Sequence, residues 1–519
     1  MGLVASIQTS SKPGPSATTI QSHEPATGAL LGEAPVTSAD EVAEVVRRAR
    51  RAQESWAALT VAERAARVLH FRDALIARQD ELVDLLSRET GKPRIEALVQ
   101  EIVPTAHVAT YFAKRAAELL APREVPMTLL VTRRSSVHYA PKGVVGVISP
   151  WNYPFFLPMR DVLLAVIAGN AVVLKPSEVT PLIALRAKDI WDHAGLPPDL
   201  FQVVTGFGPT GAALIDAGIQ LCVFTGGVAT GRRVAAACGE RLIPCVMELG
   251  GKAPFVVCRD ADLERAARAA VYGGFTNAGQ VCISVERVYA HQEVAERLEH
   301  RMTELVRELR VGDPAVSEVD VGAIIFPKQI EIAEAHIADA LAKGARLLAG
   351  GRRIQGPGQF FEPTLLAGCD HSMTVMREEI FGPVVPIMRV GSDEEAVRLA
   401  NDSHLGLNAY VFTRDRRYGV ELAERIEAGS VLVNDVVSNG GCAEAPFGGI
   451  KQSGFGRVLG DDSLREMCDA KHVSVDRVAL EREPYWFPYD QRTLGLLRRA
   501  SRLLFGGGGL ASKLGSLLD

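Results

Sequence analysis

Apolar positions near the start of the chain recur at helical spacing. Ser38 and Glu41 have the spacing of a capping box, which marks the first turn of a helix. Apolar residues then follow at intervals of three and four, namely Val42, Val45, Val46 and Ala49. A second helical pattern covers residues 62–90 and ends at Gly91, a residue type that suits a left-handed C-cap. We expect both helices to cover one face of a sheet.

From residue 144 the pattern changes, because short β-branched runs alternate with helical segments. The first series contains predicted strands at 144–148, 171–174, 201–205 and 221–225 and predicted helices at 181–194 and 210–217. The second series contains predicted strands at 254–258, 287–290, 346–348, 409–412 and 430–434. Such alternation is typical of a mostly parallel sheet. The chain is therefore predicted to be an α/β protein whose two sheet-containing domains meet near Glu248.

Four segments stand apart from these two series. Segments 130–141 and 471–480 are predicted to form a small β arm, and residues 471–478 would pair with the first segment or with the edge of another subunit. Such an arm predicts a homodimer or homotetramer. Residues 1–20, which are rich in Ser, Thr, Gly and Pro, are predicted to be a disordered extension. Residues 481–519 form a C-terminal extension with a Leu- and Arg-rich helix.

Composition and charge narrow the possible classes of protein. The 519 residues carry a net charge of −5, so no global basic field favours nucleic acid. The eight cysteines show no paired spacing, which supports neither a disulfide framework nor a metal site and fits a reducing compartment. The first 20 residues lack the features of a signal peptide, and no apolar run is long enough for a membrane-spanning helix. We expect a cytoplasmic protein.

One thiol and one carboxylate carry the strongest chemical signal. Cys282 lies in a turn of small residues, Asn277-Ala-Gly-Gln-Val-Cys-Ile-Ser284, and Glu248 lies 34 residues before it. A thiol attacks well only as the thiolate, and a free Cys with a pKa of ~8.5 is mostly protonated at neutral pH. A nearby carboxylate can take a proton from the thiol or, later, from a water. We interpret the pair as a nucleophile and its base.

Further motifs follow predicted strands, where open α/β sheets bind ligands. Lys175-Pro-Ser-Glu178 offers a cation and an acceptor to ribose hydroxyls, and its glutamate would repel a 2′-phosphate, which favours NAD over NADP. Gly226-Gly-Val-Ala-Thr-Gly231 opens a helix and lets the backbone approach a pyrophosphate. Gly206-Phe-Gly-Pro-Thr-Gly211 is a poor dinucleotide fingerprint, because no acidic residue ends a strand ~20 residues later. In Pro150-Trp-Asn-Tyr-Pro154, the Asn152 amide can donate to an oxyanion.

Taken in order, these motifs resemble those of the NAD(P)-dependent aldehyde dehydrogenase superfamily over roughly residues 20–480. The matching blocks are Pro150-Trp-Asn-Tyr-Pro154, Lys175-Pro-Ser-Glu178, Phe224-Thr-Gly226, Glu248-Leu-Gly-Gly-Lys252, Gly279-Gln-Val-Cys282, Glu378-Glu-Ile-Phe-Gly-Pro383 and Pro446–Arg457. The resemblance implies two doubly wound parallel-sheet domains and an oligomerisation arm. It assigns 21–129, 142–247 and 450–470 to an NAD-binding domain and 248–449 to a catalytic domain.

The resemblance also implies roles for single residues. Cys282 would attack an aldehyde, Asn152 would hold the oxyanion, and Glu248 would activate the water that releases the acid. Lys175 belongs to this catalytic set as well as to the cofactor site. The cofactor site would comprise Ile148, Trp151, Lys175, Ser177, Glu178, Gly208, Gly211, Phe224, Gly227, Thr230, Leu249, Glu379 and Phe381. Two positions depart from the family pattern, since Gly227 replaces a common Ser and Asp469 replaces a common Glu.

The substrate is less clearly indicated. Arg160, nine residues after Trp151, matches the position at which succinate-semialdehyde dehydrogenases grip the substrate carboxylate; its alternative is a salt bridge with Asp161. The tail helix, with Leu494, Leu497 and Leu504 beside arginines, suggests a second alternative. A basic amphipathic helix can lie in a membrane interface, as expected for a fatty aldehyde dehydrogenase, or pack on its own protein. A CoA-acylating or non-catalytic homologue stays open.

Overall fold

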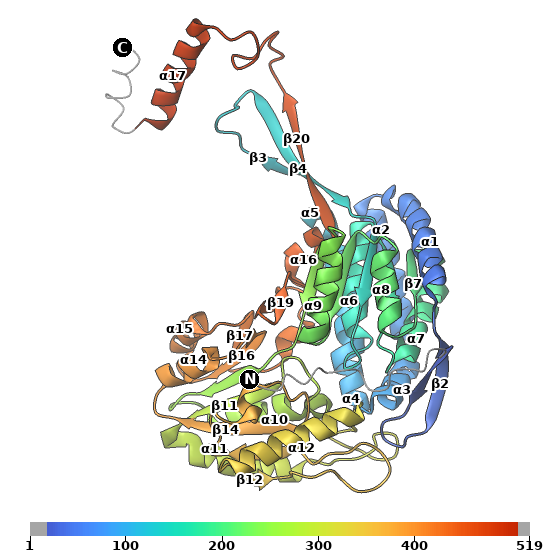
Figure 1. Cartoon of the computed structure of the whole chain (residues 1–519), viewed down its shortest axis with the longest axis vertical. Helices are drawn as coiled ribbons and strands as arrows, with labels where there is room; N and C mark the ends of the chain where they lie inside the picture. The colour runs from blue at the N-terminus through green and yellow to red at the C-terminus, as the bar shows by residue number, and fades with distance from the viewer. Residues whose placement is uncertain (1–17, 507–519) are drawn as a thin grey trace. The chain divides into compact units, whose positions relative to one another are not determined.

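The computed structural model describes residues 18–506, and the chain divides into two compact units. The first unit holds the residues before Pro122 together with Tyr139–Ala470, and the second holds Pro122–His138 with the residues from Lys471 onward. Both large sheets belong to the first unit, with helices on their faces (Figure 1). The expected N-terminal extension falls mostly outside the described residues. Residues 18–20 are described, and Thr19 and Ile20 belong to the first strand, so the predicted disorder is wrong for these two.

A hairpin and a layer of helices open the first unit. They are β1 (Thr19–His23), β2 (Leu30–Pro35), α1 (Ala39–Ala57), α2 (Val61–Ala77), α3 (Gln79–Thr90), α4 (Arg94–Ala97), the π-helix η1 (Leu98–Ile102) and α5 (Val103–Leu119). The predicted capping box at Ser38 is confirmed. The single helix predicted over 62–90 is wrong, because the backbone breaks at Arg78 and a new helix begins with Asp80 and Glu81 in its first turn. Acidic residues there stabilise a helix N-terminus.

The first sheet has the strand order β19-β9-β8-β5-β6-β7. Its strands are β5 (Val144–Ile148), β6 (Ala171–Lys175), β7 (Phe201–Val203), β8 (Leu221–Thr225), β9 (Cys245–Glu248) and β19 (Gly454–Phe455). All pair in parallel except β19, which is antiparallel to β9. The connecting helices are α6 (Phe156–Ala168), α7 (Pro181–His193), η2 (Pro198–Leu200), α8 (Gly208–Asp216) and α9 (Val228–Glu240), with α16 (Gly460–Glu466) further on. Every residue of α6 is buried.

The second sheet has the strand order β12-β13-β14-β11-β10-β16-β17. Its strands are β10 (Ala253–Val257), β11 (Val285–His291), β12 (Arg346–Ala349), β13 (Thr364–Ala367), β14 (Val384–Val390), β16 (Asn408–Phe412) and β17 (Ser430–Val433). Only the edge strand β12 is antiparallel to its neighbour. The other elements are α10 (Leu263–Phe275), η3 (Thr276–Gly279), α11 (Gln292–Glu308), α12 (Pro327–Ala342), α13 (Thr374–Arg377), α14 (Asp393–Asn401), α15 (Arg416–Arg425), η4 (Ser438–Gly441) and the pair β15 (Leu405–Gly406) and β18 (Ile450–Lys451). The predicted α/β fold with two doubly wound sheets is confirmed.

A three-stranded antiparallel sheet and a terminal helix make up the remainder. The sheet has the order β20-β4-β3, with β3 (Arg123–Val125), β4 (Arg133–Pro141) and β20 (Cys468–Asp476). Of the two pairings predicted for the segment after Lys471, the structure shows the one within the chain. The helix is α17 (Gln491–Phe505), and none of its residues is buried. The rest of the expected C-terminal extension, from residue 507, lies outside the described residues.

Candidate active site

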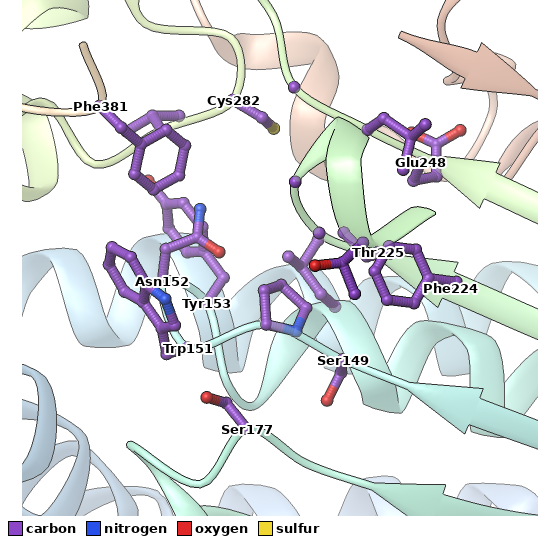
Figure 2. Close-up of a pocket in the computed structure, with 18 of the residues that line it drawn as sticks. Ser149, Trp151, Asn152, Tyr153, Ser177, Phe224, Thr225, Glu248, Cys282 and Phe381 are labelled. Carbon is purple, nitrogen blue, oxygen red and sulfur yellow. The ribbon is translucent and has the colours of Figure 1, made fainter. Parts of the chain in front are cut away.

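A cavity of about 1810 Å³ within the first unit receives residues from both large sheets. Figure 2 shows Cys282, Asn152 and Glu248 around this space, together with Trp151 and Phe381. All the site residues predicted from the sequence line it. They are Ile148, Trp151, Asn152, Arg160, Lys175, Ser177, Glu178, Gly208, Gly211, Phe224, Gly227, Thr230, Glu248, Leu249, Cys282, Glu379 and Phe381.

A strained turn after α10 presents the thiol. Asn277 and Ala278 have left-handed backbones with φ of 49° and 54°, and Gly279 follows with φ of 73°. A Cβ at Gly279 would lie 2.2 Å from the carbonyl oxygen of Gly382, so only glycine fits without a shift of the backbone. Strain of this kind must be held in place by the surrounding contacts. The turn thereby fixes where the Cys282 thiol enters the cavity.

The resting thiol is held in its neutral form. Burial is the main cause that raises the pKa of Cys282 to about 12, and the carboxyl groups of Glu248 and Glu379 raise it further. The guanidinium of Arg160 acts in the opposite direction. Ionising the thiol therefore requires a proton acceptor or a nearby positive charge.

Glu248 ends strand β9 and is only 3% exposed. Its Oε1 atom has no hydrogen-bond partner among the described residues. Burial raises the pKa of the Glu248 carboxyl to about 8, with a smaller opposing effect from Arg160 and a raising effect from Asp161. A carboxyl group that titrates near neutral pH and has a free oxygen is suited to general base catalysis.

Asn152 lies in the turn that follows β5 and is 3% exposed. Its side-chain Nδ2 donates to the backbone oxygen of Gln280, at 3.1 Å, which ties it to the turn that carries the thiol. Its own backbone oxygen accepts from Lys92 Nζ at 2.9 Å and from Asn277 Nδ2 at 3.1 Å. The amide is therefore held beside the nucleophile turn from two directions.

The residues predicted to hold a dinucleotide occupy another part of the cavity. At the end of β6, Lys175 Nζ lies 3.4 Å from Glu178 Oε2, and burial lowers the pKa of the lysine. Gly227 precedes α9, and a Cβ there would meet nothing within 4 Å. A phosphate would therefore find open space and a helix N-terminus at this point. These features fit an NAD-type cofactor.

Glu379 and Phe381 lie on the loop before β14. Glu379 Oε1 accepts from the backbone N–H of Gly251 at 3.0 Å, and burial raises the pKa of this carboxyl to about 8. The Phe381 ring contacts the Trp151 ring edge-on, with centroids 5.4 Å apart. Phe381 has a left-handed φ of 55°, and its backbone N–H donates to the carboxylate of Glu286. This loop is therefore fixed against the turn after β5.

Arg160 projects from the buried helix α6 and is 1% exposed. Its Nε donates to Asp161 Oδ1 at 3.2 Å, so the salt bridge considered from the sequence is present. Its two terminal nitrogens have no hydrogen-bond partner among the described residues. The salt bridge satisfies only one of the three guanidinium nitrogens, so the other two can donate to a group bound in the cavity.

Most of the other residues between the thiol and the surface are apolar. They include Val99, Val103, Phe156, Leu157, Tyr272 and Val437. Val99 and Tyr272 are both 49% exposed, which puts them at the mouth of the cavity. An aldehyde entering here would pass along a mostly hydrophobic wall.

Some residues near the site lie elsewhere than the sequence predicted, and others were not predicted at all. Asp469, considered as an assistant to the base, instead pairs with Lys142 at 2.5 Å and does not line the cavity. Arg457 and Glu466 act on the pKa of Glu248 in its place. The buried anchors Lys92, Glu96 and Glu101 were missed, because contacts between distant segments leave no local pattern.

No helix within residues 18–506 is long and apolar enough to cross a membrane. No group of three or more His, Cys, Asp or Glu side chains in that range could hold a metal ion.

Comparisons with known proteins agree with this geometry. The family model described as "Aldehyde dehydrogenase family" matches residues 13–473. The chain is 41% identical to the 4,4′-diapolycopene aldehyde oxidase of a Methylomonas species over 91% of this chain and 88% of that protein. It is 43% identical to a Mycolicibacterium smegmatis protein named "Putative succinate-semialdehyde dehydrogenase" (NADP+) over 87% of this chain and 88% of that one.

A solved structure gives the same result. The succinate-semialdehyde dehydrogenase of Burkholderia pseudomallei superposes with a TM-score of 0.85 at 37% identity, covering 88% of this chain and 94% of that one. With the family match spanning most of the sequence, the chain belongs to the aldehyde dehydrogenase family and is an oxidoreductase that uses NAD(P).

Proposed function

We propose that this enzyme oxidises an aldehyde to a carboxylic acid through a covalent bond to Cys282. The observation that carries the proposal is the meeting of a thiol, a donor amide and a carboxyl group with a free oxygen in one cavity. The Cys282 thiol first gives up its proton to water. Its Sγ then attacks the aldehyde carbon and forms a thiohemiacetal, while the Asn152 amide and the backbone N–H of Cys282 stabilise the oxyanion. Bound NAD would accept the hydride, which leaves a thioester.

Glu248 acts in the second half of the reaction. It takes a proton from a water molecule, and the resulting hydroxide attacks the thioester carbon. The acid leaves, and the thiolate of Cys282 is regenerated. Lys175 takes no part in these bond changes in this scheme, since its partner Glu178 holds it at the cofactor end of the cavity.

The central test uses Cys282→Ser. NADH formation from an aldehyde is expected to fall at least ~1,000-fold, since losing the nucleophile of a covalent mechanism removes most of the rate. Mass spectrometry of the wild-type enzyme, quenched during turnover, should show the acyl adduct on the peptide that holds Cys282. Turnover by the serine variant at the wild-type rate would end the proposal.

We further infer that NAD is preferred over NADP. The carboxylate of Glu178 lies beside the predicted ribose position and would repel a 2′-phosphate. The M. smegmatis relative is named for NADP+, so the comparison does not decide the point. Steady-state kinetics with each cofactor should give a higher kcat/KM with NAD, and Glu178→Gln should narrow the difference. A higher kcat/KM with NADP in the wild-type enzyme would refute this inference.

For the substrate, we infer an aldehyde that also carries an acid group, such as succinate semialdehyde. The support is Arg160, whose two free nitrogens can bind a carboxylate bidentately. Arg160→Ala should lower kcat/KM at least ~30-fold more for succinate semialdehyde than for hexanal, because both substrates lose the effect of the guanidinium on the Cys282 pKa but only the semialdehyde loses a charge-assisted contact. Asp161→Asn is the control, since it breaks the salt bridge and keeps the guanidinium. Equal losses on both substrates would remove the idea.

A second candidate is an apolar aldehyde delivered at a membrane surface. The hydrophobic mouth of the cavity supports it, as does the relative named for diapolycopene aldehyde. In α17 the arginines (Arg492, Arg498, Arg499 and Arg502) fall within an arc of about 120° when residues are spaced ~100° apart, and Leu494, Leu497 and Leu504 lie on the opposite side. Deleting 490–519 should abolish flotation with anionic vesicles and leave hexanal oxidation unchanged. Flotation that persists after the deletion would oppose this candidate.

Oligomeric state, cellular compartment and CoA dependence complete the proposed function. We propose a homodimer or homotetramer formed through the β20 arm, which sedimentation of a variant with prolines in β20 would test. We propose a cytoplasmic enzyme, because all eight cysteines are free. NADH formation without added CoA would separate hydrolysis from the CoA-acylating alternative.

A further inference from the structure

The segment from Lys92 to Glu101 carries three buried charged side chains. Lys92, Glu96 and Glu101 are 1%, 7% and 0% exposed. The segment contains α4 and the π-helix η1, and π-helical turns are frequent near functional sites. Burying a charge is costly unless it is paired and hydrogen-bonded. The partners of these three groups therefore indicate what the segment is for.

Glu101 and Lys92 hold the loop that carries Asn152. Glu101 Oε2 accepts from the backbone N–H groups of Phe155 and Phe156, at 2.8 and 3.1 Å, where α6 begins. Glu101 Oε1 accepts from Lys92 Nζ at 2.5 Å. The same Lys92 Nζ donates to the backbone oxygen of Asn152 at 2.9 Å. The ion pair thus fixes the loop at two points, one at Asn152 itself and one three residues later.

Glu96 holds the turn that carries the thiol. Its Oε1 accepts from Thr276 Oγ1 at 2.7 Å, and its carboxylate accepts from the backbone N–H of Asn277 at 3.0–3.1 Å. Asn277 is one of the left-handed residues of this turn. Asn277 Nδ2 also donates to the backbone oxygen of Asn152, so a hydrogen bond joins the two loops directly. One short segment therefore anchors both loops.

We propose that Lys92, Glu96 and Glu101 are positioning residues that hold the Asn152 amide and the Cys282 thiol in register. The inference rests on the function proposed above for Asn152 and Cys282. Catalytic groups work only when held within ~0.5 Å of their productive geometry, and a displacement of ~1 Å costs on the order of 100-fold in rate. None of the three anchors needs to touch the substrate for its loss to slow the reaction.

The chain offers a matched control in Glu89. This residue is 0% exposed and accepts from the backbone N–H groups of Leu182 and Ile183, at 3.0 and 2.9 Å, where α7 begins. It also accepts from Ser22 Oγ at 2.7 Å. Glu89 therefore accepts as many hydrogen bonds as Glu101, two of them from the backbone at a helix start, but its third partner is a hydroxyl and not an ammonium. Neither carboxylate lines the cavity, and Glu89 holds the start of α7 whereas Glu101 holds the start of α6, which follows the Asn152 turn.

The test compares Glu101→Gln with Glu89→Gln. Both should lower the melting temperature. Only Glu101→Gln should lower kcat, by about tenfold or more, with the aldehyde KM and the affinity for NADH changed less than ~threefold. When Asn152 has already been replaced by alanine, adding Glu101→Gln should lower kcat by less than a further ~twofold, because Glu101 acts through Asn152. Where Glu101→Gln does not accumulate, Lys92→Met/Glu101→Gln removes both charges together.

A second readout separates the two loops. Glu96→Gln should change the rate at which iodoacetamide alkylates Cys282, whereas Glu101→Gln should leave it within ~twofold of wild type. The inference is overturned if Glu101→Gln lowers kcat as much in the Asn152→Ala variant as in wild type, or if Glu89→Gln lowers kcat as much as Glu101→Gln does. Failure of the proposed function looks different, since Asn152→Ala and Cys282→Ser would then themselves leave turnover intact.

Discussion

The protonation of Glu248 should set the pH dependence of turnover. Its carboxyl is 3% exposed, and burial raises its pKa from 4.5 to about 8. A shift of this size corresponds to about 5 kcal/mol of preference for the neutral form. If the ionised carboxylate activates water, about a tenth of the enzyme is competent at pH 7, so kcat should rise about tenfold per pH unit below pH 7 and about fivefold between pH 7 and pH 8. Above that value the rate should level off.

The same shift has a consequence for stability. A group whose pKa is raised by folding stabilises the protein below its unfolded pKa, and that contribution is lost as pH rises through the folded value. The buried Glu248 carboxyl therefore costs the folded state least at pH 4.5 and below, and the cost grows as the pH rises to about 8. Glu248→Gln removes this dependence, so the variant should lose less stability than wild type between pH 5 and pH 9.

The assay follows NADH after mixing with aldehyde. Glu248→Gln should give about one NADH per subunit in a burst and then turn over at least ~100-fold more slowly, because the thioester forms and water attacks it poorly. Hydroxylamine should restore turnover by cleaving the thioester directly. Glu89→Gln is the control for stability, because the pKa of Glu89 is also raised by burial, to about 7, away from the cavity. Steady-state turnover by Glu248→Gln within twofold of wild type would refute the reasoning.

Three further predictions concern the turn before Cys282, the start of α9 and the pKa of the thiol. Gly279→Ala should abolish turnover and lower the melting temperature, since its Cβ would lie 2.2 Å from the oxygen of Gly382; normal activity would contradict the required left-handed turn. Gly227→Ser should leave the melting temperature unchanged, because a Cβ there meets nothing within 4 Å, and a loss of stability would contradict that open space. The pKa of the Cys282 thiol should fall in Glu248→Gln and rise in Arg160→Gln, since the carboxyl group raises it and the guanidinium lowers it. The alkylation rate of Cys282 measured against pH reports this pKa. A shift of the pKa in the same direction in both variants would contradict the prediction.

The elements that the sequence predicted well are those with local signals. The capping box at Ser38 and the left-handed Gly91 are set by contacts within a few residues. The β-branched runs of β5, β6 and β8 are buried on both faces, so their apolar pattern is continuous and easy to recognise. By contrast, β14 contains Pro386, which argues against a strand, and it went unpredicted.

The difference between local signals and long-range contacts is larger in the candidate active site. Cys282 and Glu248 were found because each lies in a motif of its own. The bonds that Glu96 makes to Thr276 and Asn277 join residues 180 and 181 positions apart, and no spacing rule connects them. The free nitrogens of Arg160 were equally hidden, since the neighbouring Asp161 suggested a satisfied pair. Contacts that depend on the packing of two sheets cannot be read from either segment alone.

The raised pKa values of the cavity have a common origin in that packing. Cys282 comes from the turn before β11, Glu248 from the end of β9 and Glu379 from the loop before β14, and all three line the same cavity. Burial is the main cause of the raised pKa of each. Burial penalises every negative charge there, and each ionised group would raise the pKa of the next. The resting site therefore keeps its acids neutral, and any positive charge brought beside them lowers all three pKa values together. The Cys282 thiol should therefore stay protonated until a positive charge is bound beside it, and the rate at which iodoacetamide alkylates it should rise when such a charge is present.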